Sequence, residues 1–360
     1  MACNAESDTS SKKTFFYISF LNVFSALAVI MLHANGTFWK YRNDSSWMLN
    51  NIIECLFYFA VPIFFMLTGA TLLDYQKKYD TKTFFKRRFA KILIPFTFWS
   101  IFGIFYYAII EQYGWEPNIN DAFNALFSGC FVNIFWFFPP LICIYLTIPL
   151  FSAIKENKKQ DILKYLVAVG FLLNILIPFL LDTLNYAFKL DLKWPYEFCV
   201  MSGFLIYPVI GYLLHNIKLT KNQRKIIYTL AVFSLFVHIF GTYFLSVRAD
   251  KLVTLFKGYL NVPCFFYSIG LFVFIKQLSN SEKFVAFFKK PVLFLQRYSF
   301  AFYLLHFFVI KDITRFLATT EIPEESFIYV VLRFIFTILI CIIATFIIRK
   351  IPKIGKLILP

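Results

Sequence analysis

Apolar side chains dominate the stretch FFYISFLNVFSALAVIMLH (residues 15–33), which carries no ionisable side chain apart from tyrosine before His33. As an α-helix, these 19 residues extend over about 27 Å, close to the ~30 Å hydrocarbon core of a bilayer. Lys12 and Lys13 precede the stretch, as in a signal peptide, but no small-x-small cleavage site closes it. The sequence therefore predicts an uncleaved first membrane span.

The rest of the chain has the same character. Of its 360 residues, 59% are apolar, 21% are aromatic and only 16% are charged, and the mean hydropathy is +0.67. Globular domains carry about 25% charged residues, and no polar stretch here is long enough to form the surface of a soluble domain. The predicted fold class is an all-α integral membrane protein without a soluble domain.

Nine more apolar runs follow the first. Ten spans are expected, at residues 15–36, 50–73, 92–110, 131–151, 162–181, 198–215, 226–246, 258–275, 298–317 and 327–349. Each is expected to be helical because backbone groups that face lipid must be hydrogen-bonded within their own segment. Pro62, Pro95, Pro178, Pro208 and Pro263 would then lie inside helices, which spanning helices tolerate.

Lys and Arg alternate between the loops. The two ends of the chain and one set of alternate loops hold 25 of them, whereas the other loops hold nine. Cytoplasmic loops carry such an excess, so both termini are predicted to be cytoplasmic. The expected organisation is a cytoplasmic segment at 1–14, a membrane domain at 15–349 and a cytoplasmic tail at 350–360.

The net charge of +16 does not indicate nucleic-acid binding, because the basic residues lie between apolar runs instead of on one face of a domain. The seven cysteines are scattered, mostly within apolar runs, and no CxxC motif or His/Cys cluster occurs. Neither a disulfide framework nor a metal site is predicted.

Ionisable groups inside spans are the best indicators of function, because hydrocarbon makes them costly without a partner or a cavity. His33 follows Asn22 by 11 residues, close to three helical turns, so both should project from one face about 16 Å apart. The stripe between them carries Ser25, Ala26 and Val29. Small residues favour close helix packing, which places this face in the bundle interior. The alternative is an interfacial histidine at the membrane edge.

Glu54 lies about four residues into the second span from the same outer side, at a depth that matches His33. A carboxylate that orients an imidazole is a common base-activating arrangement, so Glu54 is a candidate partner of His33. The alternative is a membrane-edge carboxylate without a partner. His306 lies in the ninth span, about eight residues from its cytoplasmic edge. His215 and His238 are interpreted as structural histidines.

The densest basic cluster is TFFKRRFAKILIP (residues 83–95), which contains Arg87, Arg88 and Lys91. It is interpreted either as positive-inside anchoring on anionic lipid or as a docking site for a phosphorylated ligand, which Arg forks bind well.

Five motifs in order resemble those of the membrane-bound acyltransferase family 3. The first span resembles its Arg/Lys-x10-His pattern, with His33 at the histidine position. The other four are VPIFFMLTGA (61–70), RFAK (88–91), the block that begins at Trp136, and the block from Tyr298 to His306. The phrases LNVFSALA and HANG look like those of a branch of capsule and exopolysaccharide acyltransferases.

The resemblance implies an enzyme of a bacterial plasma membrane that transfers an acyl group, with acetyl favoured, from acetyl-CoA or another acyl-CoA to a glycan. The acceptor would be a sugar hydroxyl of a cell-surface polysaccharide or of its lipid-linked precursor. His33 would be the base, with Glu54 as its orienting partner. Arg87, Arg88 and Lys91 would hold the donor phosphates. Three residues would line the path or the pocket: Asn22, Trp136 and His306.

Two positions depart from the family pattern. Asn22 stands where Arg or Lys is usual, and Lys91 keeps the charge of a motif arginine but loses its bidentate fork. The basic cluster and His33 are also separated by about 27 Å of helix. Either the donor arm threads between helices or the acyl group is relayed.

Two other classes of protein remain open. A transporter or flippase for a lipid-linked or anionic substrate would use the same basic loop without making a bond. A receptor or structural membrane protein would show no dependence on coenzyme A.

Overall fold

The computed structural model describes residues 5–110, 120, 123 and 132–360, and every regular element in this part of the chain is helical. Most of the expected loop 111–130 and the beginning of the fourth expected span lie outside the described residues. The α-helices are α1 (Ala5–Ala34), α2 (Ser45–Phe57), α3 (Ala60–Leu72), α4 (Thr81–Ile110), α6 (Phe138–Ser152), α7 (Glu156–Phe171), α8 (Ile177–Phe188), α9 (Ile206–Asn216), α10 (Lys221–Phe236), α11 (Thr242–Ala249), α12 (Val262–Leu278), α13 (Glu282–Gln296), α14 (Ser299–Leu317), α15 (Phe327–Ile348) and α16 (Gly355–Ile358).

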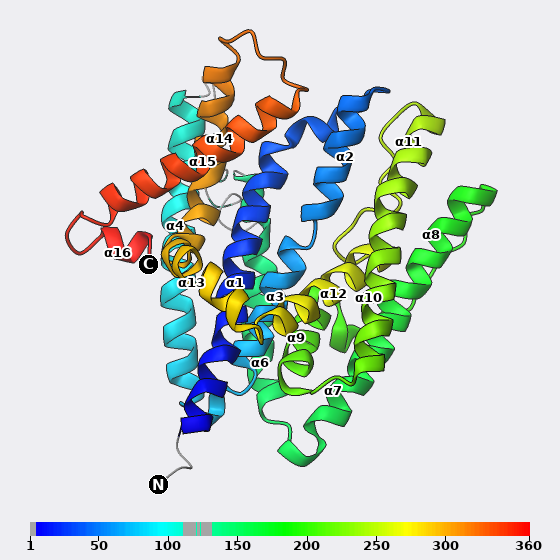
Figure 1. Cartoon of the computed structure of the whole chain (residues 1–360), viewed down its shortest axis with the longest axis vertical. Coiled ribbons are helices and arrows are strands. Elements are labelled where there is room, and N and C mark those ends of the chain that lie inside the picture. Colours follow the sequence, from blue (N-terminus) through cyan, green and yellow to red (C-terminus); the bar gives the residue numbers. More distant parts are fainter. Residues whose placement is uncertain (1–4, 111–119, 121–122, 124–131) are drawn as a thin grey trace.

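Helix α1 runs through the middle of the bundle (Figure 1). It contacts α2, α3, α12, α13, α14 and α15, so its side chains meet several elements that are distant in sequence. Helices α8, α10 and α11 form one flank, and α15 and α16 lie on the opposite flank. The short α16 folds back against α4, where the Trp99 indole N–H donates to the carbonyl of Ile358 at 3.0 Å.

Seven helical segments in the described residues are long and apolar enough to cross a membrane, or eight if the bent pair α12–α13 counts as one span. The fold class is thus confirmed as a multi-pass, all-α membrane protein, but the expected count of ten is not. Helix α9 has 11 residues, about 16 Å, which is too short to span alone. Helix α14 has 19 residues but carries Lys311, Asp312 and Arg315 in its second half. Helices α12 and α13 meet at 107°.

The prolines expected inside helices explain some of these breaks. Only Pro95 lies deep within its helix, α4. Pro62, Pro178, Pro208 and Pro263 each occupy the second or third position of α3, α8, α9 or α12. The first turn tolerates proline because its N–H groups have no partner within the helix. Pro208 and Pro263 therefore mark helix starts, whereas Pro62 and Pro178 lie within the continuous 33-residue helical segments Ser45–Lys77 and Glu156–Phe188, as expected.

Polar caps fix several other helix starts. The Asp44 carboxylate accepts from the backbone N–H of Trp47 at 2.6 Å at the start of α2. This hydrogen bond lowers the pKa of Asp44 below its ordinary value. A capping box between Thr220 and Gln223 begins α10, and Ser326 caps α15.

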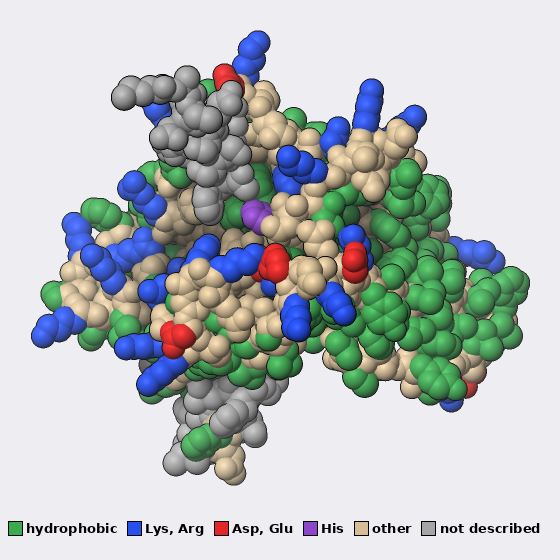
Figure 2. All heavy atoms as spheres, turned by 90° about the horizontal axis from the view of Figure 1, so that it is seen from below, with side chains coloured by type: hydrophobic (Ala, Val, Ile, Leu, Met, Phe, Trp, Pro, Cys, Tyr) green, Lys and Arg blue, Asp and Glu red, His purple; other side chains and the backbone are tan. Residues whose placement is uncertain are grey.

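Apolar side chains cover the flank formed by α8, α10 and α11. Figure 2 shows hydrophobic atoms gathered at this end of the visible face, with most Lys and Arg side chains over the remainder. Phe188, Phe233 and Phe244 are each more than 60% exposed. Such a contiguous apolar surface is a liability in water but suits contact with lipid.

The tightest helix crossing joins α3 to α9 through two glycines. A Cβ on Gly69 would lie 1.7 Å from the carbonyl oxygen of Pro208, and one on Gly211 would lie 1.9 Å from that of Met66. The two backbones therefore touch reciprocally, as small residues allow in membrane bundles.

We predict that Gly69→Ala and Gly211→Ala each destabilise the fold, because the added methyl group meets backbone that cannot move aside. Overpacking of this kind costs about 1–3 kcal/mol or more. Thermal unfolding in detergent, followed by fluorescence-detected size exclusion, measures the effect. Gly258→Ala is the control, since its nearest neighbour, the Cβ of Asn261, lies at 3.5 Å. Equal stability of all three variants would contradict the close crossing.

Candidate functional site

Two histidines from different helices meet inside the bundle. The ring centroids of His33, near the end of α1, and His306, in α14, are 5.0 Å apart. His306 is fully buried, whereas His33 is partly exposed. His33 therefore faces another polar side chain in the interior, as the stripe on the first span predicted.

The hydrogen bonding of His306 fixes its tautomer when the ring is neutral. Its Nδ1 lies 2.7 Å from the carbonyl oxygen of Phe302, which can only accept, so Nδ1 carries the proton. The buried Nε2 has no hydrogen-bond partner among the described residues and remains an acceptor. A buried acceptor without a partner is costly, which suggests that it serves a ligand or a proton transfer.

A buried arginine lies beside this pair. Arg333 of α15 donates from Nη1 to the carbonyl oxygen of Ala34 at 2.8 Å, directly after His33 in the chain. Its Nε is buried and has no hydrogen-bond partner in the part of the chain that the structure describes. Arg333 thus fastens the end of α1 and keeps one unused donor next to the imidazole pair.

Glu54 is placed differently from the expectation. Its Oε1 lies 2.8 Å from Lys257 Nζ, and its Oε2 accepts from Asn35 Nδ2 at 3.1 Å. Lys257 Nζ also lies 3.9 Å from the ring centroid of Tyr58. No hydrogen bond links Glu54 to His33 among the described residues. Equal depth in the membrane did not make Glu54 the partner of His33, because the Glu54 carboxylate pairs with the buried Lys257 ammonium group instead.

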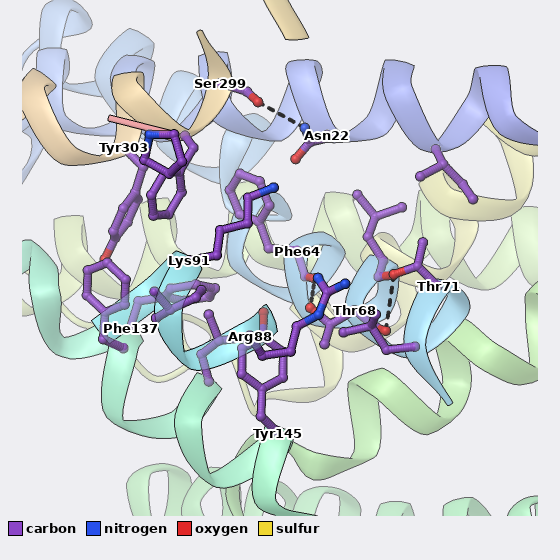
Figure 3. Close-up of a pocket in the computed structure, with 18 of the residues that line it drawn as sticks. Asn22, Phe64, Thr68, Thr71, Arg88, Lys91, Phe137, Tyr145, Ser299 and Tyr303 are labelled. Atoms are coloured by element: carbon purple, nitrogen blue, oxygen red, sulfur yellow. Dashed lines mark hydrogen bonds between the residues drawn. The ribbon is translucent and has the colours of Figure 1, made fainter. Parts of the chain in front are cut away.

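A chamber lies beside the part of α1 that contains Asn22. A cavity of about 380 Å³ is lined by residues of α1, α3, α4, α6 and α14, including Asn22, Arg88 and Lys91. Figure 3 shows Asn22, Arg88 and Lys91 around this cavity, with Tyr145 next to Arg88. Asn22 donates to the Ser299 hydroxyl at 3.0 Å, so Asn22 and His33 both contact α14. The shared face of these two residues is confirmed.

The charge of the chamber is positive. Arg297 joins Arg88 and Lys91 in its lining, and no Asp or Glu is among the described residues that line it. Arg88 has a buried Nε that finds no hydrogen-bond partner within the described ranges. Three cations in a partly enclosed site suit a ligand with several negative oxygens, since guanidinium groups pair strongly with phosphate.

Tyr303 connects the chamber to the histidine pair. Its side chain lines the cavity, and its ring centroid lies 6.1 Å from that of His306. Its hydroxyl donates to the carbonyl oxygen of Ile134, which fixes the ring. The chamber and the imidazoles are therefore neighbouring parts of one interior region.

Two predicted residues lie outside the chamber lining. Arg87 is exposed, and its guanidinium carbon lies 4.9 Å from the ring centroid of Tyr79. Trp136 stacks on Tyr259 at 5.5 Å, while the next two residues of its motif, Phe137 and Phe138, line the chamber.

In the described hydrogen bonds and ring contacts, the two histidines that the sequence assigned to structure contact neither the His33–His306 pair nor a residue of the chamber lining. His215 Nδ1 lies 2.6 Å from the hydroxyl of Tyr17. His238 is fully buried, and its ring lies edge-on to that of Tyr58 at 5.5 Å.

Sequence reasoning missed several residues of the site. Ser299 and Tyr303 stood in the quoted motif block without a role, and Arg297 directly precedes that block; their position before His306 was the available signal. Arg333 lies in the tenth expected span and received no role. Lys257 was counted as a loop residue, and nothing in the sequence indicated its burial.

The helical membrane bundle, with an imidazole pair in its interior beside a basic chamber, defines a membrane protein with a site equipped for group transfer. A family model described as an acyltransferase domain matches residues 15–346. The chain belongs to this family, in agreement with the resemblance to acyltransferase family 3, and it is a membrane acyltransferase. No match was found among curated proteins or among solved structures.

We predict that Arg88→Ala weakens binding of coenzyme A at least tenfold, because the guanidinium group faces the chamber and a charge-assisted hydrogen bond is worth about 1.5–3 kcal/mol. Isothermal titration with the purified protein measures this. Arg87→Ala is the matched control, since this exposed neighbour lies outside the chamber lining. Equal losses in both variants would indicate that only the net charge of the loop matters.

We also predict that Glu54→Ala destabilises the protein by about 3–5 kcal/mol, because it leaves the Lys257 ammonium group buried and unpaired. The double variant Glu54→Leu/Lys257→Met should recover most of the loss. Thermal unfolding in detergent is the measurement, and Lys40→Ala, which breaks an exposed pair with Glu324 at 3.6 Å, is the control. A double variant no more stable than Glu54→Ala would show that the pair does more than neutralise charge.

Proposed function

We propose that this protein is an O-acyltransferase that moves an acyl group, preferably acetyl, from acyl-coenzyme A to a sugar hydroxyl of a cell-surface polysaccharide or its lipid-linked precursor. The observation that supports this most directly is the continuity from the basic chamber through Tyr303 to the His306–His33 pair. A donor phosphate site and a candidate base then border one interior region.

His33 accepts the hydroxyl proton as the sugar oxygen attacks the thioester carbonyl. A C–O bond forms, the C–S bond breaks, and the proton passes to the departing thiolate. An imidazole suits both transfers, because its ordinary pKa lies near neutrality. His306, with Nδ1–H bound to Phe302, presents Nε2 to receive a proton or to orient His33.

Arg333 stabilises the negative charge that develops on the thioester oxygen. Its guanidinium group lies at the end of α1 and keeps an unused buried donor, and such preorganised donors are worth about 3–4 kcal/mol in acyl transfer.

Arg88, Lys91 and Arg297 hold the phosphates of the donor. Arg297 replaces Arg87 in the proposed donor site, because Arg297 lines the chamber and Arg87 does not. Asn22 lacks the positive charge that the family pattern has at this position, and these three cations supply positive charge instead. Asn22 itself binds Ser299 and holds α1 against α14.

The chamber reaches the level of Asn22, so the donor enters the bundle from the side predicted to be cytoplasmic. About 16 Å of α1 then separates Asn22 from His33. The extended pantetheine arm follows the path beside Tyr303, in preference to a relay through a covalent intermediate. The expected location is a bacterial plasma membrane.

We predict that His33→Ala abolishes acylation of the surface glycan at unchanged protein level, while coenzyme A still binds with wild-type affinity. The base lies outside the donor chamber lining, so chemistry and donor binding should separate. Mass spectrometry of purified glycan, before and after mild alkali, reports the ester-linked acyl mass.

His215→Gln is the control, because His215 lies outside the proposed machinery. A transporter or flippase would instead change the amount of glycan and leave its acylation unaltered. If the glycan were fully acylated in cells with His33→Ala, His33 would not be the catalytic base.

A further inference from the structure

A separate cavity lies on the flank of the bundle. It has a volume of about 220 Å³ and lies between the α7–α8 region and the segment 194–206. Its lining includes Asn174, Trp194, Tyr196, Glu197 and Met201, none of which contributes to the donor chamber. The volume is below the ~300–1,000 Å³ of sites for drug-sized ligands, so it suits one ring-sized group.

Asn174 builds one wall of this cavity. Its amide donates to the carbonyl oxygens of Phe198 and Met201 at 3.0 and 3.1 Å and accepts from the Phe198 N–H at 2.8 Å. It lies in a π-helical turn, Leu172–Leu176, that interrupts the long helix between α7 and α8. Such turns are frequent at functional sites.

Trp194 is fixed by the same turn. Its indole N–H donates to the carbonyl oxygen of Leu173 at 2.9 Å. Asn185 binds both the N–H and the C=O of Leu192, at 2.8 and 2.9 Å. Three side chains therefore hold an irregular segment in place, which is far more than a connection between helices requires.

The rim offers an aromatic face and a carboxylate. The rings of Trp194 and Tyr196 are 5.1 Å apart at 69°, and Tyr196 is 67% exposed. The Glu197 carboxylate has no hydrogen bond or ion pair with the described residues. Aromatic faces bind the C–H faces of sugars, and a carboxylate accepts from their hydroxyl groups.

The charge of this cavity excludes the donor. Glu197 is the only residue charged at neutral pH among the described residues that line it, so its carboxylate disfavours phosphates and uronates. Charge counting also places the segment 182–197 on the same side of the membrane as the His33 end of α1. A neutral ligand that approaches from the predicted outer side fits both facts.

Aromatic side chains connect the cavity to the proposed reaction centre. Phe204 and Tyr259 each directly adjoin a lining residue in sequence, and both contact Trp136, with ring centroids 5.8 and 5.5 Å away. Phe137, the next residue, lies 5.6 Å from Tyr303, whose ring neighbours His306.

We propose that this cavity is an acceptor subsite that binds one neutral sugar unit of the glycan, stacked on Tyr196 and hydrogen-bonded to Glu197, while another unit of the same chain presents its hydroxyl to His33. The subsite rests on the proposed acyltransferase function and gives a role to Trp136 as part of the path between them. Binding energy from such a remote unit serves to position the reacting group.

The test uses the full-length protein in nanodiscs with acetyl-CoA and oligosaccharides of two to six units, cut from the host surface glycan and de-O-acylated with mild alkali. Tyr196→Leu and Glu197→Gln should each raise the acceptor KM at least fivefold without changing coenzyme A binding. The matched controls are Tyr186→Leu, an exposed aromatic outside the cavity lining, and Asp191→Asn, an exposed carboxylate paired with Lys193. Saturation-transfer NMR with the same oligosaccharides measures sugar binding directly.

Each result decides the proposal. An unchanged KM and NMR signal in both variants overturns it, and so does a parallel loss of coenzyme A binding and thermal stability, which marks a structural role. Where the wild-type protein transfers no acetyl group, the acyltransferase proposal fails. The NMR signal then still decides the subsite, because sugar binding that depends on Tyr196 and Glu197 sustains it and no binding overturns it.

Discussion

The seam between α1 and α14 is the interaction on which the site depends. Ionisable groups inside a bilayer are costly unless they meet partners or a cavity. Asn22 with Ser299, and His33 with His306, satisfy this requirement at two levels of the same helix pair. A rotation of α1 about its axis would break both contacts together, so the seam fixes which face of α1 looks into the bundle.

The end of α1 is fastened by polar and charged side chains from other segments of the chain. Glu54 binds Asn35, and Arg333 binds the carbonyl of Ala34, so two different helices hold the turn that follows His33. Lys257 neutralises Glu54 from a third segment. Catalytic groups need placement within about 0.5 Å, and such clamps supply it where the lipid environment offers no hydrogen bonds.

The sequence was sufficient for features that follow from local spacing. The membrane class, the shared face of Asn22 and His33, and the basic motif at Arg88 and Lys91 all depend on residues close together in the chain. Partners from distant segments could not be derived in this way. Lys257 pairs with Glu54 although 203 positions separate them in the chain, and no sequence periodicity predicts this contact. The count of ten spans is not confirmed for a related reason, because hydropathy measures how apolar a run is but not where proline or packing divides it, as in α9.

The two departures from the family pattern, at Asn22 and Lys91, are explained by how positive charge is distributed around the chamber. A binding site for several phosphates needs a positive field more than it needs a cation at one position. Arg88 and Lys91 come from α4 and Arg297 from the junction between α13 and α14, and all three line the chamber with Asn22. An uncharged residue at position 22 therefore leaves the field in place and frees the amide to bind Ser299. The loss of the bidentate fork at Lys91 has less effect in a chamber that already contains two guanidinium groups. The acidic and aromatic cavity on the flank lacks such a field, so in the proposed mechanism charge directs donor and acceptor to different cavities before either reaches the histidines.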